Sequence, residues 1–467
     1  MDYTIQQALI PTATSYDTVD VQIQGGRIAA IAPHLDTIGT VIDGNNKLLL
    51  PGFVNAHTHS SEMWQRGIIP PVPLELWIAE LYDFVPLDPE MVYLSALGTA
   101  VETMMTGGTT VVDHLVLIPG RELETVETAV NAYRQAGIRA YVGPLIQDQS
   151  LTTSLPSGDT AIDHEPYVRN TEQTLTLMQE VIDRFHRPDE GINIMTAPTG
   201  MQLCSDELFK GCVELSNRYN LCRHTHLLET KAQQMLAQEK YGHSAVRQLE
   251  KLDFLSPKTS LAHCVWLTDD DIAIMAATQA TVVHNPLSNL RLGSGIAPVL
   301  KYLQAGVNVS FGCDGSASND SQDLLEAVKI GSILHNVTDF DYRHWISPRQ
   351  AVQMAALGGA KGLGAADRFG SLTVGNEADL VLYDLTTLSI LPKTDPIGLL
   401  ILGRPVNIVH SAWVRGKQTI ADGKPVYVDL TNLQQDLFAK SSWNFNRESK
   451  TLKQIEGYYR SVMKLPA

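Results

Sequence analysis

Two His-x-His triplets, at residues 57–59 and 224–226, are the stretches whose residue types and spacing most directly suggest chemistry. Residues two apart in a strand point to the same face, so His57 and His59 can reach one metal ion. A single triplet is a weak motif, but each of these two ends an apolar run. Because imidazole nitrogens suit zinc and iron, the pair of triplets predicts a metal site.

The second triplet is followed by an acidic residue in the stretch HTHLLET. We expect His226 to be a metal ligand and Glu229 to curl back over the metal, where a carboxylate can move a proton from water to a substrate. The alternative for Glu229 is a solvated loop charge or a contact with the N-terminus of the next helix. His224 also faces inward but lies deeper, which favours a core or supporting role.

Further polar residues end other apolar runs. Asp314 follows VNVSFG, and a buried carboxylate is costly unless it meets a cation, so we predict that Asp314 is a ligand. His263, in LAHCVWL, is either a ligand or an unligated histidine that hydrogen-bonds the attacking hydroxide. His284 and Asn285 are expected near the site, where a supporting role is favoured over substrate contact. The run INIMTAPTGM lacks a terminal lysine that could bridge two metals, so one metal is expected.

The elements that position these residues are short apolar runs that alternate with helical stretches. This alternation predicts repeated βα units and a parallel sheet. In barrel enzymes the active site lies at the carboxyl ends of the strands, which is where these polar residues fall. The number of runs, eight, predicts a TIM-type (β/α)8 barrel, and the runs are LLLPGFVNAHTH, TTVVDH, GIRAYVGP, INIMTAP, LCRHTH, TSLAHCV, TVVHNP and VNVSFGCD.

The two ends of the chain read differently. Residues 1–52 and 369–430 have short alternating strands with glycine-containing turns, and we expect them to pair into one composite β-sandwich. Residues 53–368 then form the (β/α)8 barrel that carries the predicted metal site, and residues 431–467 form a C-terminal helical extension. The fold class is therefore α/β. The Gly-rich LGSGIAPV lacks a phosphate-loop pattern and is predicted to be a loop before a helix.

The composition of the chain limits the classes of partner that we expect it to bind. The net charge of −16 over 467 residues argues against nucleic acid or an anionic membrane surface. There is no apolar run of about 18 residues and no signal-peptide pattern at the N-terminus. The five cysteines include no Cys-x-x-Cys motif, which favours free thiols in a reducing cytoplasm.

In combination these motifs resemble the amidohydrolase superfamily, in its branch of cytosine deaminase-like and triazine hydrolase-like enzymes. The resemblance covers about residues 1 to 430. Its segments are PGFVNAHTH, HTHLLE, LAHC, HNPLSNLRLGSGIAPV and GCDGSASNDS, with GNEADLVLYDL and WVRGKQTIADGKPV in the flanks.

The resemblance implies a (β/α)8 barrel with a composite β-sandwich and one divalent metal, zinc first and iron as the alternative. It implies that Glu229 is the proton shuttle and that His263 orients the hydroxide and stabilises the developing oxyanion, with Asp314 also holding the hydroxide. The ligands that it implies are His57, His59, His226 and Asp314.

The expected enzyme is a hydrolytic deaminase that attacks an amino-bearing carbon of a purine, pterin, nucleoside or triazine ring and releases ammonia. A triazine hydrolase that displaces chloride or an alkylamine is the alternative within enzymes, and a catalytically silent binding barrel is the alternative from another class. The expected partners are a small heterocycle, water and a second copy of the chain, in a homodimer or higher homo-oligomer.

The substrate ring is left open by the sequence. The fourth-strand loop reads TAPTGMQLCS, and Thr199 stands where adenosine-type deaminases have a histidine. A pocket for a flat, moderately apolar ring is expected from chain position. The residues assigned to it are Trp77, Tyr82, His114, Met201, Gln202, His284 and Asn285.

Overall fold

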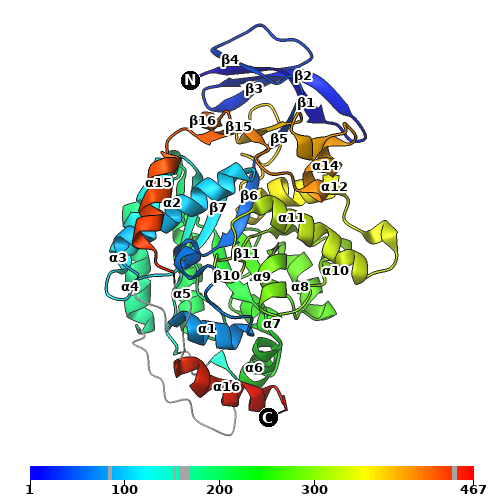
Figure 1. Ribbon diagram of the computed structural model, residues 1–467. Helices are drawn as coiled ribbons and strands as arrows, with labels where there is room; N and C mark the ends of the chain where they lie inside the picture. The colour runs from blue at the N-terminus through cyan, green and yellow to red at the C-terminus, as the bar shows by residue number, and fades with distance from the viewer. Residues whose placement is uncertain (83–86, 151–153, 157–168, 444–449, 467) are drawn as a thin grey trace.

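Figure 1 shows a computed structural model of the chain, which describes every residue except 83–86, 151–153, 157–168, 444–449 and 467. Its centre is made of eight short parallel strands, one in each of the eight runs predicted from the sequence. The first four-stranded sheet contains β6 (Phe53–Thr58), β7 (Gly108–Leu115), β8 (Arg139–Pro144) and β9 (Ile192–Ile194). The second contains β10 (Arg223–Leu227), β11 (Thr259–His263), β12 (Thr281–His284) and β13 (Val309–Phe311).

The two sheets meet along both of their edges. Isolated bridges pair Thr196 with Arg223 and Gly200 with His226, which joins the end of β9 to β10. On the other side, the backbone N–H of Asp314 donates to the carbonyl of His57 at 2.9 Å, which joins the end of β13 to β6. Nearly every strand residue is buried, as expected for parallel strands that helices cover.

Helices connect the central strands and pack around them (Figure 1). Their first turns follow the capping chemistry of the sequence. Ser205 accepts from Leu208 N–H at the start of α5 (Asp206–Tyr219), and Asn170 and Gln173 form a capping box at the start of α4 (Thr171–Phe185). The connecting helices include α2 (Pro89–Met105), α3 (Glu122–Ala136), α4 (Thr171–Phe185), α5 (Asp206–Tyr219), α6 (Lys231–Tyr241), α7 (Ala245–Lys251), α8 (Asp269–Thr278), α9 (Pro286–Arg291) and α10 (Val299–Gln304). Two further helices, α11 (Leu324–Ile333) and α12 (Pro348–Gln353), follow the last central strand.

Strands from the two chain ends lie together at one end of the molecule, at the top of Figure 1. Antiparallel pairing of β5 with β14 joins them, so hydrogen bonds connect all of them into a single nine-stranded sheet. One of the predicted glycine-containing turns lies between β2 and β3 at Gly25 and Gly26, and both glycines have positive φ. The strands are β1 (Tyr3–Pro11), β2 (Tyr16–Gln24), β3 (Arg27–Ala32), β4 (Thr40–Asp43), β5 (Lys47–Pro51), β14 (Leu380–Asp384), β15 (Val409–Val414), β16 (Lys417–Ala421) and β17 (Lys424–Pro425).

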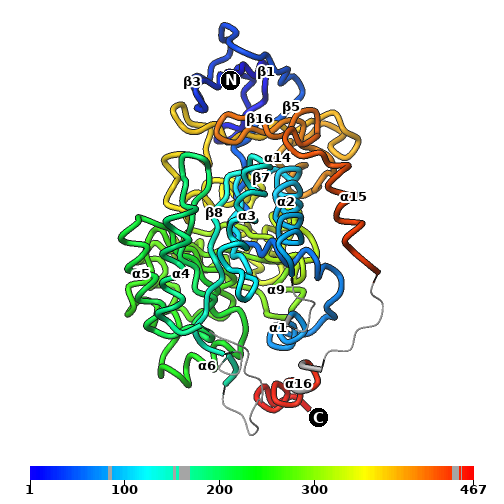
Figure 2. Tube along the Cα trace, turned by 90° about the vertical axis from the view of Figure 1, so that its left-hand side faces the viewer, coloured from blue at the N-terminus to red at the C-terminus, as the bar shows by residue number. Residues whose placement is uncertain are grey.

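Two helices follow the nine-stranded sheet near the C-terminus. Figure 2 shows α15 (Leu430–Lys440) beside α2, while α16 (Lys450–Val462) lies at the opposite end of the molecule from the sheet. There α16 packs on α1 (Leu74–Tyr82) in one apolar cluster, to which α1 gives Leu76 and Ala79 and α16 gives Ile455 and Tyr458. The other face of α1 contributes to the cavity described below.

All five cysteines are buried and unpaired, as predicted. Among the described residues, the helices are too short or too polar to span a bilayer.

Candidate active site

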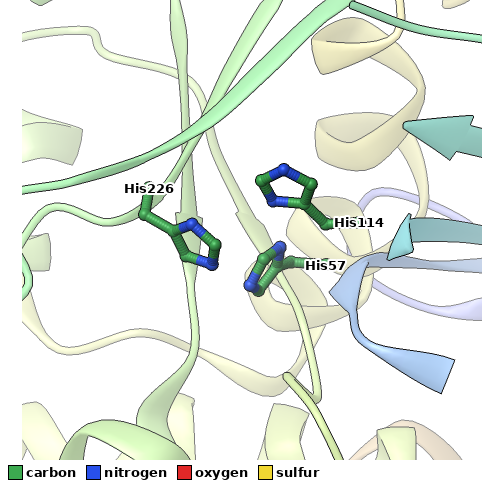
Figure 3. Close-up of side chains that lie close together, drawn as sticks. All are labelled: His57, His114 and His226. Atoms are coloured by element: carbon green, nitrogen blue, oxygen red, sulfur yellow. The ribbon is translucent and has the colours of Figure 1, made fainter. Parts of the chain in front are cut away.

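Histidines and one aspartate from several strand ends meet at a single point. His57 and His59 come from the end of β6, His114 from β7 and His226 from β10, and Asp314 follows β13. Figure 3 shows the rings of His57, His114 and His226 close together. Ligand-type atoms lie within 4.8 Å of one another in two overlapping groups: His57, His59 and Asp314, and His57, His114 and His226.

The hydrogen bonds of His59 and His226 fix which ring nitrogens face this point. Nδ1 of His59 donates to the carbonyl of His114, and Nδ1 of His226 donates to the carbonyl of Thr199, both at 2.6 Å. Each Nε2 therefore keeps its lone pair, and the two Nε2 atoms lie 3.1 Å apart. Two lone pairs cannot hydrogen-bond each other, so this arrangement calls for a cation between them.

His57 is oriented by a chain of contacts that runs from Ser260 through His224. His224 contacts Ser260 Oγ through Nδ1 at 2.7 Å and meets Nδ1 of His57 through Nε2 at 2.8 Å. When His224 accepts from His57, Nε2 of His57 has a free lone pair, and this buried atom has no hydrogen-bond partner among the described residues. Burial lowers the pKa of His57 to about 4, which keeps the ring neutral and able to bind metal.

Asp314 supplies the anionic group. Its Oδ1 lies 3.3 Å from Nε2 of His57 and 3.6 Å from Nε2 of His59. Burial alone would raise the pKa of Asp314, but the neighbouring His57, followed by His263 and His59, lowers it well below its usual value. Its backbone takes the unfavourable φ of +66°, and Thr58 and Gln322 fix its carbonyl.

This donor set fits a divalent metal. Zinc–nitrogen bonds are about 2.0–2.1 Å long, so two ligands on one tetrahedral ion lie about 3.4 Å apart. The separations of 3.1, 3.3 and 3.6 Å among the four donor atoms bracket that value. Three neutral imidazoles with one carboxylate form a set that suits zinc or iron. His114 belongs to the second of the two groups above: its Nε2 donates to the carbonyl of Ala197 at 2.9 Å, so its Nδ1 keeps a lone pair and has no hydrogen-bond partner among the described residues.

Glu229 and His263 face each other beside the donor cluster. Nε2 of His263 lies 3.5 Å from Oε2 of Glu229 and 3.9 Å from Oδ2 of Asp314. Burial raises the pKa of Glu229 to about 7, and the charge of Asp314 adds to this effect. Ser294 donates to Oε1 of Glu229 at 3.1 Å, so the carboxyl is held in place and can exchange a proton near neutral pH.

His263 is fixed by strain and by one amide. Its φ is +73°, and the next residue, Cys264, also has positive φ, so the chain bends sharply where β11 ends. Nδ1 of His263 donates to Oδ1 of Asn289 at 2.9 Å, which turns Nε2 toward Glu229 and Asp314. Strained backbone of this kind is concentrated at functional sites.

A cavity of about 350 Å³ opens above the cluster and is reached by Glu229, His263 and Asp314. Most of its exposed wall is apolar, although many polar side chains also line it, and a largely apolar wall is typical of a site for a flat organic molecule. The apolar side chains on its wall include Leu74, Trp77, Ile78, Leu81, Leu87, Leu117, Ile118, Leu203 and Leu292.

The residues assigned to substrate from chain position divide into three groups. Trp77 and Gln202 line the cavity. Met201 packs in the main hydrophobic core instead, because adjacent residues of a tight turn project in different directions. The side chain of Tyr82 lies outside the described residues.

His284 and Asn285 are also placed away from the cavity. His284 contacts His335, with their Nε2 atoms 3.3 Å apart, behind the site. Nδ2 of Asn285 lies 3.4 Å from Nδ1 of His263, so it is a neighbour of that histidine, as the sequence favoured.

Several residues at the site were not singled out from the sequence. Ser294 belongs to the Gly-rich stretch interpreted as a plain loop, and Asn289 lies in HNPLSN, just beyond the residues considered. Glu62 and Gln65 follow the first His-x-His triplet and line the cavity. Their place at the site could have been predicted from the sequence, because polar residues in a short segment directly after a ligand pair have little room to reach solvent.

The chain matches the family model described as Amidohydrolase family over residues 48–426. It is 34% identical over 428 residues to the 5′-deoxyadenosine deaminase of Methanosarcina barkeri, which covers 89% of this chain and 91% of that protein.

Two solved structures resemble the fold closely. The atrazine chlorohydrolase of Arthrobacter aurescens TC1, complexed with zinc, has a TM-score of 0.85 and 26% identity and covers 94% of this chain and 99% of its own. An adenosine deaminase from Xanthomonas campestris with bound zinc has a TM-score of 0.81 and 26% identity over 94% of this chain and 98% of its own. With the family model and the relatives in agreement, the chain belongs to the amidohydrolase family.

Proposed function

We propose that this protein is a metal-dependent hydrolytic deaminase that replaces an amino group on a ring carbon of an N-heterocycle with oxygen and releases ammonia. The main support is that Glu229, with a pKa near 7, shares one cavity with the convergent His/Asp donor set. The relatives agree in kind, since one is named a 5′-deoxyadenosine deaminase and one structure an adenosine deaminase.

The metal ligands in this proposal are His57, His59, His226 and Asp314. A divalent ion bound there lowers the pKa of water, so that hydroxide is available near neutral pH. Zinc is the first candidate, because two similar structures contain it, and iron is the second. Thr199 and His114 act on the ligands through their carbonyls, which orient His226 and His59.

Glu229 is the proton carrier in this mechanism. Its carboxylate accepts a proton from the attacking water and passes that proton to the ring nitrogen of the substrate. His263 directs Nε2 at the same space and stabilises the negative charge that develops on the attacking oxygen. Asp314, held anionic, completes the group that orients the water, and the ring rests against the apolar wall that includes Trp77, with Gln202 at its edge.

A second candidate is a triazine hydrolase that displaces chloride or an alkylamine. The structural similarity to an atrazine chlorohydrolase favours it specifically. The catalytically silent barrel is disfavoured, because the chain has both the donor set and the proton carrier.

Further proposals concern the whole molecule. We propose that the eight central strands form one closed (β/α)8 barrel over about residues 53–368, supported by the bonds across both seams. Residues 1–52 and 369–430 form the family's β-sandwich, and 431–467 a helical extension. Buried, unpaired cysteines support a cytoplasmic location. Exposed Val337, Phe340 and Tyr342 support a homodimer, for which light scattering is the test.

The test is an ammonia-release screen over aminated purines, pterins, pyrimidines, nucleosides and triazines, with metal content measured on the same sample. Ammonia release from one ring class, with one metal per chain, is the expected result. Chloride or alkylamine release without ammonia would favour the triazine hydrolase instead. No release from any ring by metal-loaded protein would refute both candidates.

A further inference from the structure

The short helix η1 (Ser60–Gln65) directly follows the metal ligands of β6 and has an unusual set of side chains. Ser61, Glu62 and Gln65 are only 1%, 4% and 5% exposed, and all three line the cavity. In each of them one oxygen, namely Oγ, Oε2 and Oε1, has no hydrogen-bond partner among the described residues. Buried polar atoms are nearly always paired, so three together on one wall call for a missing partner.

The geometry of η1 places these groups on one surface. In a 3₁₀ helix the side chains at i and i+3 eclipse each other, so Glu62 and Gln65 lie one above the other. The helix α1 contributes apolar side chains to the same cavity, including Trp77 and Ile78. The cavity therefore has a polar η1 wall, formed by Ser61, Glu62 and Gln65, and an apolar wall to which α1 contributes.

The position of Glu62 is built into the fold by a glycine. A Cβ on Gly315 would lie 1.8 Å from Oε2 of Glu62. The φ of Gly315 is outside the left-handed region, so glycine is present for space and not for backbone conformation. Any other residue at position 315 would therefore exclude the Glu62 carboxyl group from its position beside Asp314.

We propose that the η1 wall is the specificity-determining subsite of this enzyme and binds hydrogen-bond donors, N–H or O–H, on the substrate. The unpartnered atoms are all oxygens, and each can accept a hydrogen bond from such a donor. A ring amino or N–H group and the hydroxyls of an attached sugar are the two possible sources. A site built to hydrogen-bond a substrate group discriminates strongly against analogues that lack it, because its buried groups then stay unpaired.

Product-type ligands test this subsite without turnover. In inosine, 2′-deoxyinosine, 3′-deoxyinosine and guanosine the 6-amino group of an adenine-type ring is already replaced by oxygen, and calorimetry gives their dissociation constants on the full-length, metal-loaded protein. The dissociation constants of inosine and its deoxy forms, compared with each other, measure the contribution of the hydroxyl donors. The dissociation constants of guanosine and inosine measure the contribution of the ring amino donor. The proposed subsite depends on the proposed function only in that the function determines this choice of ligands. Ammonia release is measured separately and tests the proposed function itself.

Three substitutions are compared with the wild type: Glu62→Ala, Gln65→Leu and Ser61→Ala. Each removes the acceptor oxygen, and metal content and circular dichroism verify that each variant is folded. We expect about a tenfold to a hundredfold loss of affinity for the donor-bearing ligand and little change for the ligand that lacks the donor. Glu127→Ala, an exposed change on α3, is the matched control and should alter neither.

The pattern of losses decides the outcome. A loss confined to inosine, relative to its deoxy forms, assigns the subsite to sugar hydroxyls, and a loss confined to guanosine assigns it to a ring amino group. Equal losses for all ligands, no loss in any variant, or a wild type that binds all four ligands alike or not at all would overturn the proposal. Such a result would leave the ammonia screen, and hence the proposed function, standing on its own.

Discussion

Two buried ionic clusters in this molecule are built on opposite principles. At the boundary between β8 and the nine-stranded sheet, fully buried Arg139 donates from Nε and Nη2 to Asp379 at 2.9–3.0 Å and from Nη2 to Glu377 at 2.6 Å. Arg368 adds a second cation to Glu377, and the backbone N–H of Arg415 donates to Asp379. In the cavity, by contrast, the lone pairs of His59 and His226 face each other, and Oε2 of Glu62 has no hydrogen-bond partner among the described residues.

This difference distinguishes charged groups that are paired within the fold from charged groups that are available to ligands. The cluster around Arg139 is neutralised by the chain itself, so it needs no ligand, and removal of one of its charges should leave the others uncompensated and destabilise the fold. The cavity cluster is paired incompletely, and burial raises the pKa of Glu62 to about 8 and of Glu229 to about 7. Groups that the fold leaves unpaired are the ones available to a metal, a water and a substrate.

Replacement of Glu229 by glutamine should give the largest effect and should act on function alone. We expect the rate of ammonia release to fall by about 10²- to 10⁴-fold, because an amide cannot carry the proton. Metal content and melting temperature should stay close to those of the wild type. Turnover within a factor of three of the wild type would refute the assignment of Glu229, and Glu127→Gln serves as the exposed control.

Replacement of Arg139 by methionine should have the opposite profile. It leaves Asp379 and Glu377 buried without their main cation, and removal of one partner of a buried ion pair costs about 3–5 kcal/mol of unfolding free energy. Urea denaturation gives this value, while the activity per folded molecule should persist. Arg121→Met removes an exposed pair with Glu124 and should cost less than about 1 kcal/mol. Similar costs for the two variants would mean that the buried Arg139 cluster matters no more to the fold than an exposed ion pair.

Metal removal tests the cavity cluster as a unit. Chelation should abolish activity and also lower stability, since a metal at 100 times its dissociation constant contributes about 2.7 kcal/mol to the folded state. Asp314→Asn should reduce the metal found by elemental analysis, and zinc or iron added back to the chelated wild type should restore activity. Full metal occupancy in Asp314→Asn would count against its role as a ligand.

The sequence predicted the strands and the donor cluster for a simple physical reason. Apolar runs mark the buried strands, and the carboxyl ends of parallel strands meet at one edge, so His57, His226, His263 and Asp314 had to come together. The pairing of the chain ends followed from the same alternation. Family resemblance added roles for Glu229 and His263, which spacing alone left open.

What the sequence did not predict depends on side-chain direction and distant contacts. His224 contacts His57, 167 residues away, and no local sequence pattern indicates this contact. Met201 and Gln202 are neighbours in sequence, but only Gln202 reaches the cavity. Glu62 lines the cavity because Gly315, on a different segment, makes room for it. Such facts arise from packing, which chain position alone does not fix.

The smallest expected effect concerns a third buried group, His335, which packs against His284. Burial lowers the pKa of His335 to about 4, while the unfolded chain keeps the ordinary value of 6.5. Between pH 6.5 and 4 the unfolded state therefore binds a proton that the folded state does not, and the unfolding free energy falls as the pH falls. At pH 5 this loss amounts to about 2 kcal/mol.

His335→Gln should remove that part of the acid sensitivity. The difference in unfolding free energy between wild type and variant should therefore narrow as the pH is lowered from 7 to 5, and urea denaturation at each pH measures it. His34→Gln, at an exposed position, is the matched control. A difference that stays constant with pH would mean that His335 is not buried in its neutral form. A narrowing would place it with Arg139 among the groups whose charge state the fold itself determines.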